Sequence, residues 1–386
     1  MKPKVVVFGA GATGRGHVGL LAWQSGADLV FVDKKSELVE TLRKAGQYTV
    51  RLFGEMYEEV KVTGFRVFHS EERQAIAQEI QDSIAVLTAV FDQNLPDVAQ
   101  TLALAVALCR QAGRVEPLNC IACENMMDSS STLGAHVRSH LSDEDLDYCW
   151  PSWGFPDCMI SRVVPQPEPD PLLILTENYN EWTARAEAFR GNKSSALAAM
   201  ELVDNQTARL ERKLFIHNGG HAICGYTGYF RGHRYIHEAV HDPVVVKYVA
   251  GALDELGEVV RVKHGFSPAS IDAYKQDLVR RGSIPELKDE IRRVVRDPAR
   301  KLSARERLVA PALLAEEFGL PREWIVKGIV AALKYHFLVN NPEAPILPPQ
   351  QASSGLPAVL SQISGLGTTS TLTQEIVAAW ESWDLT

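Results

Sequence analysis

The chain has 386 residues, of which 46% are hydrophobic and 23% are charged, and its formal net charge is -8. A chain of this length usually forms two domains, and the composition is that of an ordinary soluble globular protein. The negative charge argues against a general nucleic-acid binder, which needs a basic surface. The six cysteines are too sparse for a secreted disulfide scaffold, and no apolar run is long enough to span a membrane. We therefore expect a cytoplasmic protein without a nucleic-acid or membrane partner.

Short apolar segments alternate with helical patterns in the first half of the chain. These segments are rich in Val, Ile and Leu without strict polar alternation, which is typical of parallel strands buried on both faces. Repeated alternation of strand and helix predicts a parallel sheet covered by helices. Two segments alternate more strictly and predict an antiparallel insertion, Tyr48–Phe53 and Glu59–Val67. The expected parallel strands are Lys4–Phe8, Asp28–Val32, Ser83–Val90, Leu118–Cys123 and Leu172–Thr176, and the expected helices include Val18–Gln24 and Val98–Gln111.

After about Glu181 the strand signals fade and long helical patterns follow. Ser303 followed by Glu306 fits a capping box at the start of one helix. The stretch Pro345–Gly355, rich in Pro, Gln and Ser, is expected to be a surface connection. We therefore expect an α/β domain over residues 1–190 and a mostly α-helical domain over residues 191–386. The expected helices of the second half are Met200–Phe215, Asp242–Lys263, Ile284–Arg296, Ser303–Phe318 and Arg322–Phe337.

A glycine motif follows the first expected strand and opens the first expected helix. Gly9 permits a tight turn, Gly11 lets the backbone approach a pyrophosphate, and Gly14 allows close packing of helix on strand. The preceding strand and the following helix are the context that such a motif requires. The sequence therefore predicts a Rossmann-type dinucleotide-binding domain. The motif reads Gly9-Ala10-Gly11-Ala12-Thr13-Gly14.

Asp33 ends the second expected strand, at the place where an acid accepts both ribose hydroxyls of the adenosine. Its charge would repel a 2′-phosphate, which favours NAD over NADP as the cofactor. Lys34 and Lys35 follow directly and would partly offset that repulsion.

A pattern typical of zinc peptidases occurs at His237-Glu238-Ala239-Val240-His241. On one helix the two histidines would share a face and the glutamate would serve as general base. Pro243 follows at once, and the residue before a proline rarely continues a helix. We therefore expect no metal here, and a metallohydrolase is kept as the alternative from another class. Cys120 and Cys123 are interpreted as core residues on a buried strand rather than as zinc ligands.

The segment Lys213-Leu-Phe-Ile-His-Asn-Gly-Gly-His221 carries the most unusual polar cluster of the second half. On a helix, Lys213, Asn218 and His221 fall within one broad sector. A partly buried lysine can take a proton from an alcohol, and an amide can stabilise the oxyanion that forms. The alternative is a surface lysine beside a glycine-rich bend.

This segment resembles the K-x4-N-x2-H signature of the polyol-specific long-chain dehydrogenases. FGAGATGRGHVG, LNCIACENM, LTENYNEW, MELVDN, RDPARKLSARERL and LSQISGL follow in that family's order, so the resemblance covers nearly the whole chain. The short total length favours the branch that acts on mannitol 1-phosphate. The resemblance implies reversible hydride transfer between that polyol phosphate and NAD, giving fructose 6-phosphate, without a metal.

Residue by residue, the resemblance implies Lys213 as general base, with Asn218 and His221 binding and polarising the substrate. Asn125, in the Cys-Glu-Asn-Met segment, would complete the oxyanion-binding pair. This position follows an expected parallel strand, where open α/β sheets place their ligands. The expected cofactor-binding residues are Gly9, Ala10, Gly11, Thr13, Gly14, Asp33 and Thr88.

Several positions depart from the family pattern. Ala12-Thr13 stand where Asn-Ile is more common, and Phe91 stands where a glycine is common. In the signature, His217 replaces a Leu or similar residue and Gly219 replaces a Thr. These departures bear on the exact substrate more than on the reaction class.

A local excess of basic residues points to a phosphate on the substrate. From residue 280 to residue 307 there are ten Lys or Arg against five Asp or Glu. A solvated helix face is the alternative, but arginine suits bidentate phosphate contact. The candidates are Arg300, Lys301 and Arg307. A dehydrogenase of an unphosphorylated polyol or sugar acid, and a catalytically dead nucleotide-binding protein, remain as alternatives.

Overall fold

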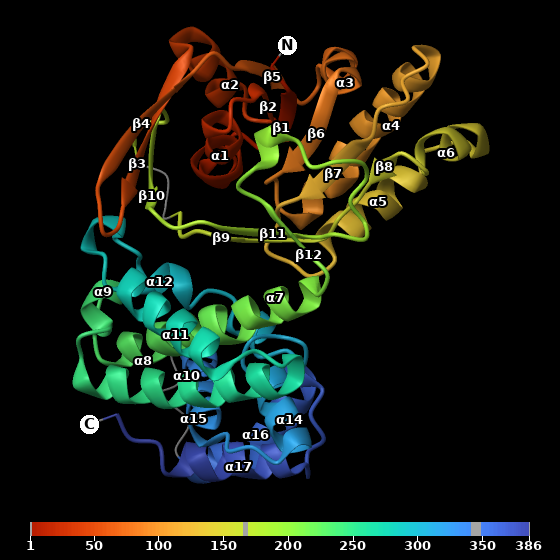
Figure 1. The fold of residues 1–386 in the computed structure, drawn as a ribbon. Coiled ribbons are helices and arrows are strands. Elements are labelled where there is room, and N and C mark those ends of the chain that lie inside the picture. The colour runs from red at the N-terminus through yellow and green to blue at the C-terminus, as the bar shows by residue number, and fades with distance from the viewer. Residues whose placement is uncertain (1, 165–168, 341–348, 386) are drawn as a thin grey trace. The chain divides into compact units, whose positions relative to one another are not determined.

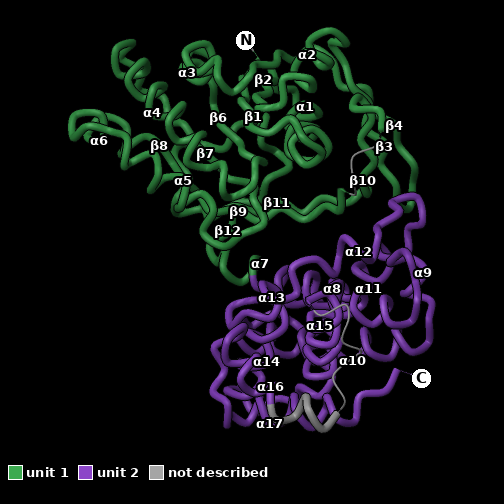
Figure 2. Tube along the Cα trace, turned by 180° about the vertical axis from the view of Figure 1, so that it is seen from behind, with its two compact units in different colours: residues 1–210 green, residues 211–386 purple. Residues whose placement is uncertain are grey.

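A computed structural model describes residues 2–164, 169–340 and 349–385, with the backbone alone for 349–354. The chain forms two compact units, Met1–Leu210 and Glu211–Thr386, coloured green and purple in Figure 2. This division falls later than the boundary expected after residue 190. The reason is a short strand, β12 (Glu201–Val203), that pairs with β11 (Glu181–Arg185) and so belongs to the first unit.

The first unit is built on a six-stranded sheet in which every neighbouring pair is parallel, and its strand order is β5-β2-β1-β6-β7-β8. The expected Rossmann-type α/β fold is confirmed, with the sheet drawn at the top of Figure 1. Four of the five expected parallel strands lie in this sheet within two residues of their expected ends. The strands are β1 (Lys4–Phe8), β2 (Asp28–Asp33), β5 (Arg66–His69), β6 (Ser83–Thr88), β7 (Leu118–Ala122) and β8 (Trp153–Gly154).

Successive residues of these strands enter two different cores. On β1, Val5 and Val7 belong to one cluster of buried residues, whereas Val6 and Phe8 belong to another. This alternation shows that both faces of the sheet are covered, as the unbroken apolar runs predicted. The covering helices are α1 (Gly19–Gln24), α2 (Ser36–Ala45), α3 (Arg73–Gln81), α4 (Leu95–Gln111), α5 (Ser129–Arg138) and α6 (Asp143–Cys149).

Two small sheets complete the first unit. The expected antiparallel insertion is confirmed for β3 (Gln47–Phe53) and β4 (Glu58–Thr63). The expected strand at Leu172–Thr176 exists as β10 (Leu173–Glu177), but it pairs with β3 instead of joining the main sheet. Its sequence identified a strand but not its partner, because a short apolar run fits either sheet. The other small sheet joins β12, β11 and β9 (Cys158–Ser161).

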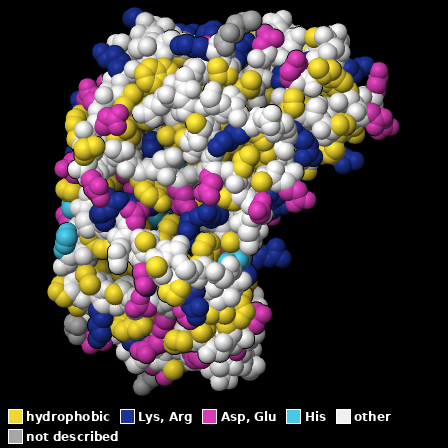
Figure 3. All heavy atoms as spheres, viewed as in Figure 1, with side chains coloured by type: hydrophobic (Ala, Val, Ile, Leu, Met, Phe, Trp, Pro, Cys, Tyr) yellow, Lys and Arg dark blue, Asp and Glu magenta, His cyan; other side chains and the backbone are white. Residues whose placement is uncertain are grey.

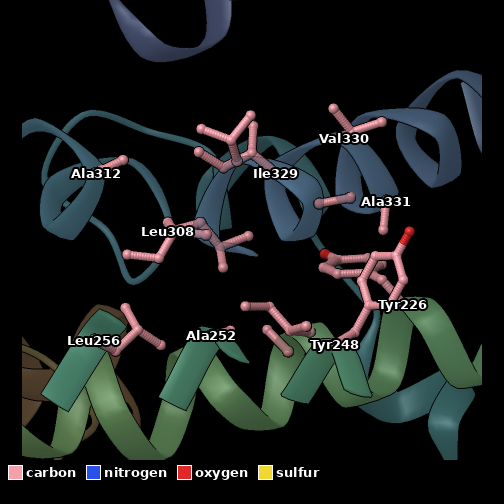
Figure 4. Close-up of a cluster of buried hydrophobic side chains, with 14 of the residues drawn as sticks. Tyr226, Tyr248, Ala252, Leu256, Leu308, Ala312, Ile329, Val330 and Ala331 are labelled. Carbon is pink, nitrogen blue, oxygen red and sulfur yellow. The ribbon is translucent and has the colours of Figure 1, made fainter. Parts of the chain in front are cut away.

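Every regular element that the structure describes in the second unit is a helix. Its core gathers apolar side chains from several helices, and Figure 4 shows Ala252 and Leu256 of α10 near Leu308. Helix α7 (Gln206–Arg212) links the two units in sequence, and a π-helical turn (Lys213–His217) follows it directly. The remaining helices are α8 (Asn218–Phe230), α9 (Ile236–Ala239), α10 (Pro243–His264), α11 (Pro268–Gly282), α12 (Ile291–Val294), α13 (Pro298–Lys301), α14 (Val309–Phe318), α15 (Glu323–Asn340), α16 (Pro349–Ser364) and α17 (Thr371–Glu381).

The expected long helices α10 and α15 are confirmed, but shorter ones differ. The segment Ile284–Arg296 contains a 3-10 turn and the four-residue α12 instead of one helix. The capping box at Ser303 is wrong, because helix α14 begins only at Val309 and the Glu306 carboxylate pairs with two arginines. Part of the expected surface connection lies outside the described residues, and the rest is helical in α16.

Basic and acidic side chains are interspersed on the face of the molecule shown in Figure 3. This face therefore presents no continuous basic surface of the kind that a nucleic-acid binder uses. Among the helices that the structure describes, none combines the length and apolar character needed to cross a membrane.

Candidate active site

The glycine turn after β1 has the geometry that the motif predicted. Gly9 has φ of +93°, and a Cβ there would lie 2.2 Å from the carbonyl oxygen of Ala89. A Cβ at Gly14 would lie 1.8 Å from the carbonyl oxygen of Gly9, so the helix can pack on the turn only without a side chain. At Gly11, by contrast, a Cβ would meet nothing within 4 Å. The open space at Gly11 leaves room for a ligand to approach the backbone.

Arg15 holds this turn from inside and was not foreseen from the sequence. Its guanidinium is buried, and Nε donates to the carbonyl oxygen of Ala10 at 2.6 Å. It also lies over the ring of Tyr48, whose hydroxyl donates to the Arg15 carbonyl at 3.0 Å. Burial lowers the pKa of Arg15, and the nearby Tyr48 and Asp33 oppose that effect. Arg15 lies in the π-helical turn Gly14–Val18 that follows the glycine motif.

Asp33 lies at the carboxyl end of β2, where the sequence expected it. Its Oδ2 accepts a hydrogen bond from the Ala10 amide at 2.8 Å, and Oδ1 accepts from the Lys35 amide at 2.9 Å. The carboxylate is half-buried beside the glycine turn. A ligand that rests on the turn would therefore meet the acid next to it. This arrangement fits the adenosine end of a dinucleotide.

Thr88 ends β6 and is tied to a glutamate that sequence reasoning missed. Its hydroxyl donates to Oε1 of Glu124 at 2.7 Å. The same carboxylate accepts from the amides of Val90 at 2.8 Å and Phe91 at 2.9 Å. Glu124 is buried at the carboxyl end of β7 and so connects the ends of two neighbouring strands. Asn125 follows it and is exposed.

Phe91 has a backbone conformation that side chains other than glycine rarely adopt. Its φ is 68° and its ψ is 149°, and its ring is 72% exposed. The hydrogen bond from its amide to Glu124 helps to hold this conformation. The structure thus explains why glycine is more common at this position: the backbone shape needs it, and Phe91 adopts the shape under strain.

In the second unit, the expected catalytic residues share one continuous helical run. Lys213 begins the π-helical turn, and Asn218 begins α8 directly after it. Lys213, Asn218 and His221 are all half-buried, which keeps them accessible to a small ligand. A π-helical turn has i→i+5 hydrogen bonds and so holds more residues than a turn of α-helix, and such turns are frequent at functional sites.

His221 is oriented by a carboxylate that sequence reasoning did not single out. Its Nε2 lies 3.0 Å from Oδ2 of Asp289, whose Oδ1 accepts from Nε of Arg293 at 2.9 Å. Burial alone would raise the pKa of Asp289, but the hydrogen bond and charge of His221, with Arg293, lower it to about 2. Asp289 is therefore an acceptor only, so Nε2 of His221 carries hydrogen. Nδ1 of His221 is then the nitrogen free to accept a hydrogen bond when the ring is neutral.

The three expected phosphate ligands have different surroundings. Lys301 is buried, and its ammonium donates to the carbonyl oxygens of Val294 and Arg296. Burial, followed by the charges of Arg307 and Arg300, lowers its pKa to about 7. The burial of Lys301 and its two carbonyl partners argue against a role of this side chain in binding phosphate. Arg300 is half exposed and pairs with Glu306 at 2.9 Å, whereas Arg307 is buried.

The residues of the zinc-peptidase pattern do not all lie on one helix. Helix α9 (Ile236–Ala239) ends before His241, so His237 and His241 do not lie along one helix. The Glu238 carboxylate accepts hydrogen bonds from two backbone amides at the start of α9. In the part of the chain that the structure describes, no three His, Cys, Asp or Glu side chains are grouped to hold a metal ion. Cys120 and Cys123 enter opposite cores, as expected for small buried residues.

Comparison with known families covers both units. A family model described as the mannitol dehydrogenase Rossmann domain matches residues 3–196, and one described as the mannitol dehydrogenase C-terminal domain matches residues 207–384. The chain belongs to the mannitol dehydrogenase family. This finding confirms the resemblance to polyol dehydrogenases drawn from the sequence.

Solved structures share the fold over almost the whole chain. Mannitol 2-dehydrogenase of Pseudomonas fluorescens, in a ternary complex with NAD and D-mannitol, has 19% identity and a TM-score of 0.77 over 99% of this chain and 91% of its own. A D-sorbitol dehydrogenase in substrate-free form has 15% identity and a TM-score of 0.78, covering 99% and 93%. A 2-dehydropantoate 2-reductase of Geobacter metallireducens has 12% identity and a TM-score of 0.53, covering 86% and 99%.

Proposed function

We propose that this protein is an NAD-dependent dehydrogenase that interconverts mannitol 1-phosphate and fructose 6-phosphate. The observation that carries the proposal is the helical run with Lys213, Asn218 and His221, in which Asp289 fixes the orientation of the histidine. A base, an amide and an oriented imidazole are the groups that alcohol oxidation needs. Membership of the mannitol dehydrogenase family supports a polyol as the substrate.

The first unit has the features that a dinucleotide needs. A Cβ at Gly11 would meet nothing within 4 Å, which leaves room for a ligand at the backbone, and Asp33 lies beside the turn. We assign Gly9, Ala10, Gly11, Thr13, Gly14, Asp33 and Thr88 to cofactor binding. When bound there, NAD supplies the hydride acceptor for the reaction. The mannitol 2-dehydrogenase with the same fold was solved with NAD, which supports this choice of cofactor.

Proton transfer is assigned to the second unit. Lys213 takes the proton from the substrate hydroxyl as the carbinol carbon is oxidised, and returns it during reduction. Asn218 donates a hydrogen bond from its side-chain amide to the substrate oxygen as negative charge develops on that oxygen. Asn125 of the first unit is assigned the same role. His221 binds a substrate hydroxyl through Nδ1, because Nε2 is engaged by Asp289.

A phosphate on the substrate is the finer part of the proposal. Its support is the basic segment that ends at Arg307, a buried arginine in an acidic protein. Buried guanidinium groups bind phosphate through two parallel hydrogen bonds, which a neutral hydroxymethyl group does not offer.

The test is NADH formation by the purified protein with a panel of substrates, followed at 340 nm, with NAD and with NADP. We expect the highest kcat/KM for mannitol 1-phosphate with NAD, and lower values for D-mannitol, D-sorbitol and D-mannonate. Activity is expected to survive a chelator. Equal efficiency on mannitol and mannitol 1-phosphate would overturn the phosphate assignment, and activity that is lost with chelator and restored by zinc would return attention to His237 and His241.

A further inference from the structure

Two buried side chains near the catalytic run have polar atoms without a partner. His217 and Arg307 are each 7% exposed. Among the described residues, Nδ1 of His217 has no hydrogen-bond partner. Arg307 uses its backbone amide and Nε to contact Glu306, at 3.4 and 2.9 Å, and no described residue accepts from its two terminal nitrogens. A buried polar atom without a partner is costly, so Nδ1 of His217 indicates a ligand, and the terminal nitrogens of Arg307 are further donors that a ligand could use.

The two side chains belong to one local structure. The ring of His217 lies 6.0 Å from the ring of His221, one turn further along the same helical run. A Cβ at Gly219 would lie 2.9 Å from the carbonyl oxygen of Arg307 and 3.3 Å from Cδ1 of Leu256. The backbone of Arg307 can therefore approach this run closely only because residue 219 lacks a side chain. The departures from the family signature at His217 and Gly219 both occur where Arg307 packs.

Burial and several neighbouring basic side chains both act on the ring of His217. Burial, and then the charges of Arg281, His221, Lys213 and Arg307, hold the pKa of His217 well below its usual range. His217 is therefore neutral, and a site that resists a further positive charge favours an anion. Three carboxylates accompany these groups: Glu306 pairs with Nε of Arg307, Asp277 lies 3.6 Å from Arg281, and Asp289 pairs with His221.

We propose that Arg307 and His217 bind the terminal oxyanion of the substrate, at the end of the polyol chain remote from the carbon that is oxidised. The proposal rests on the proposed function and identifies the residues that select a charged substrate. Arg307 would donate from its terminal nitrogens, and His217 from Nδ1–H. Lys213 begins and His217 ends the same π-helical turn, so one polyol chain can reach from the base to the histidine. A phosphate monoester and a carboxylate share this oxyanion chemistry.

The first test compares substrates in His217→Leu, which restores the type of residue that the family signature has, and in Arg307→Gln. The quantity is kcat/KM for mannitol 1-phosphate and for D-mannonate, each divided by kcat/KM for D-mannitol. We expect the phosphate ratio to fall about 10-fold to 100-fold in each variant, the usual effect of a lost charge-assisted hydrogen bond. If the carboxylate ratio falls instead, the oxyanion is a sugar acid. If neither ratio changes by more than twofold in folded variants, the subsite does not exist.

His336→Leu is the matched control, because His336 is also partly buried and its pKa is also lowered by burial, but it lies on α15. It should leave both ratios as in the wild type. Arg307→Lys keeps the charge and replaces Arg307→Gln if the latter fails to fold, as judged by circular dichroism.

A second measurement does not depend on turnover. Inorganic phosphate should raise the Tm of the wild type and of His336→Leu, and should do so much less in His217→Leu and Arg307→Lys. If no polyol gives NADH but phosphate stabilises in this pattern, the proposed reaction fails while the anion subsite stands. If all four proteins respond equally to phosphate, the subsite is wrong whatever the reaction is.

Discussion

The two units build their candidate sites in different ways. The first unit uses backbone: a glycine turn with φ of +93° at Gly9, an open approach at Gly11, and amides tied to the carboxylates of Asp33 and Glu124. The second unit uses side chains from one helical run, oriented by Asp289 and surrounded by buried arginines. A backbone site depends on a few glycines, whereas a side-chain site depends on the charges around it.

This difference predicts how each unit responds to mutation. In the first unit, changes at Asp33 or Phe91 should alter cofactor affinity or backbone strain and leave the acid–base chemistry intact. In the second unit, they should alter turnover and substrate choice and leave cofactor affinity intact. The following predictions test that separation, beginning with the largest expected effect.

Lys213→Ala should lower kcat by about 10²–10⁴-fold, because general-base catalysis usually contributes that much. NADH affinity, measured by fluorescence titration, should change little. Lys263→Ala is the control, since Lys263 pairs with Glu211 at 2.8 Å in the same unit and has no assigned role. A folded Lys213→Ala protein with near wild-type turnover would remove lysine from the mechanism.

Asp289→Asn should lower kcat by about 10–100-fold, because the imidazole of His221 loses the acceptor that selects its tautomer. The pH profile of kcat/KM should also shift, since the nearby negative charge is gone. Asp289→Glu should recover part of the loss, and Asp254→Asn, at an exposed residue paired with Lys275, should have no effect. An unchanged pH profile would indicate that Asp289 only supports the fold.

Asp33→Ser should weaken NAD binding by about tenfold and relax discrimination against NADP, because the charge that repels a 2′-phosphate is removed. The kcat at saturating cofactor should change little if the units act separately. Asp82→Ser, at an exposed carboxylate, is the control. A wild type that prefers NADP would show that this reading of Asp33 is wrong.

Phe91→Gly should raise the unfolding free energy by about 1 kcal/mol. A strained backbone of this kind costs about 1–3 kcal/mol, and the extra chain entropy of glycine offsets about 0.5–1 kcal/mol of the gain. Urea unfolding followed by circular dichroism measures this free energy of unfolding. Tyr57→Gly, at another exposed aromatic residue, should not stabilise the protein. A less stable Phe91→Gly protein would mean that the ring contributes more than the backbone costs.

Lys301→Met should change the slope of stability with pH. The folded-state pKa of Lys301 is lowered to about 7, below the unfolded value of about 10.4. The unfolded state therefore binds more protons between these values, so wild-type stability should rise with pH from about 7 to 10, by about 1 kcal/mol per pH unit. This rise should disappear in Lys301→Met. Equal slopes from urea unfolding at pH 7, 8 and 9 would show that the buried amine does not titrate in this range.

Much of the first unit could be predicted because its signals are local. The strands β1 and β2 and the glycine turn depend on short apolar runs and on backbone shapes that few residues allow. In the second unit the long helices α10 and α15 were found by their periodicity. The short α12 and the late start of α14 at Val309 were not predicted, because single turns of helix are decided by packing and not by local pattern.

The sequence by itself determined the parallel strands, the dinucleotide turn and the resemblance to the family, because each depends on short segments of residues close together in the chain. Only the tertiary structure decided that β10 pairs with β3, that Asp289 orients His221, and that Lys301 is directed to backbone carbonyls. The first two pairings join residues far apart in the chain, whereas Lys301 meets carbonyl oxygens of Val294 and Arg296, a few residues before it, through the irregular path of the chain there. Strand patterns and charges specify what kind of partner a residue needs, but packing selects which partner it meets.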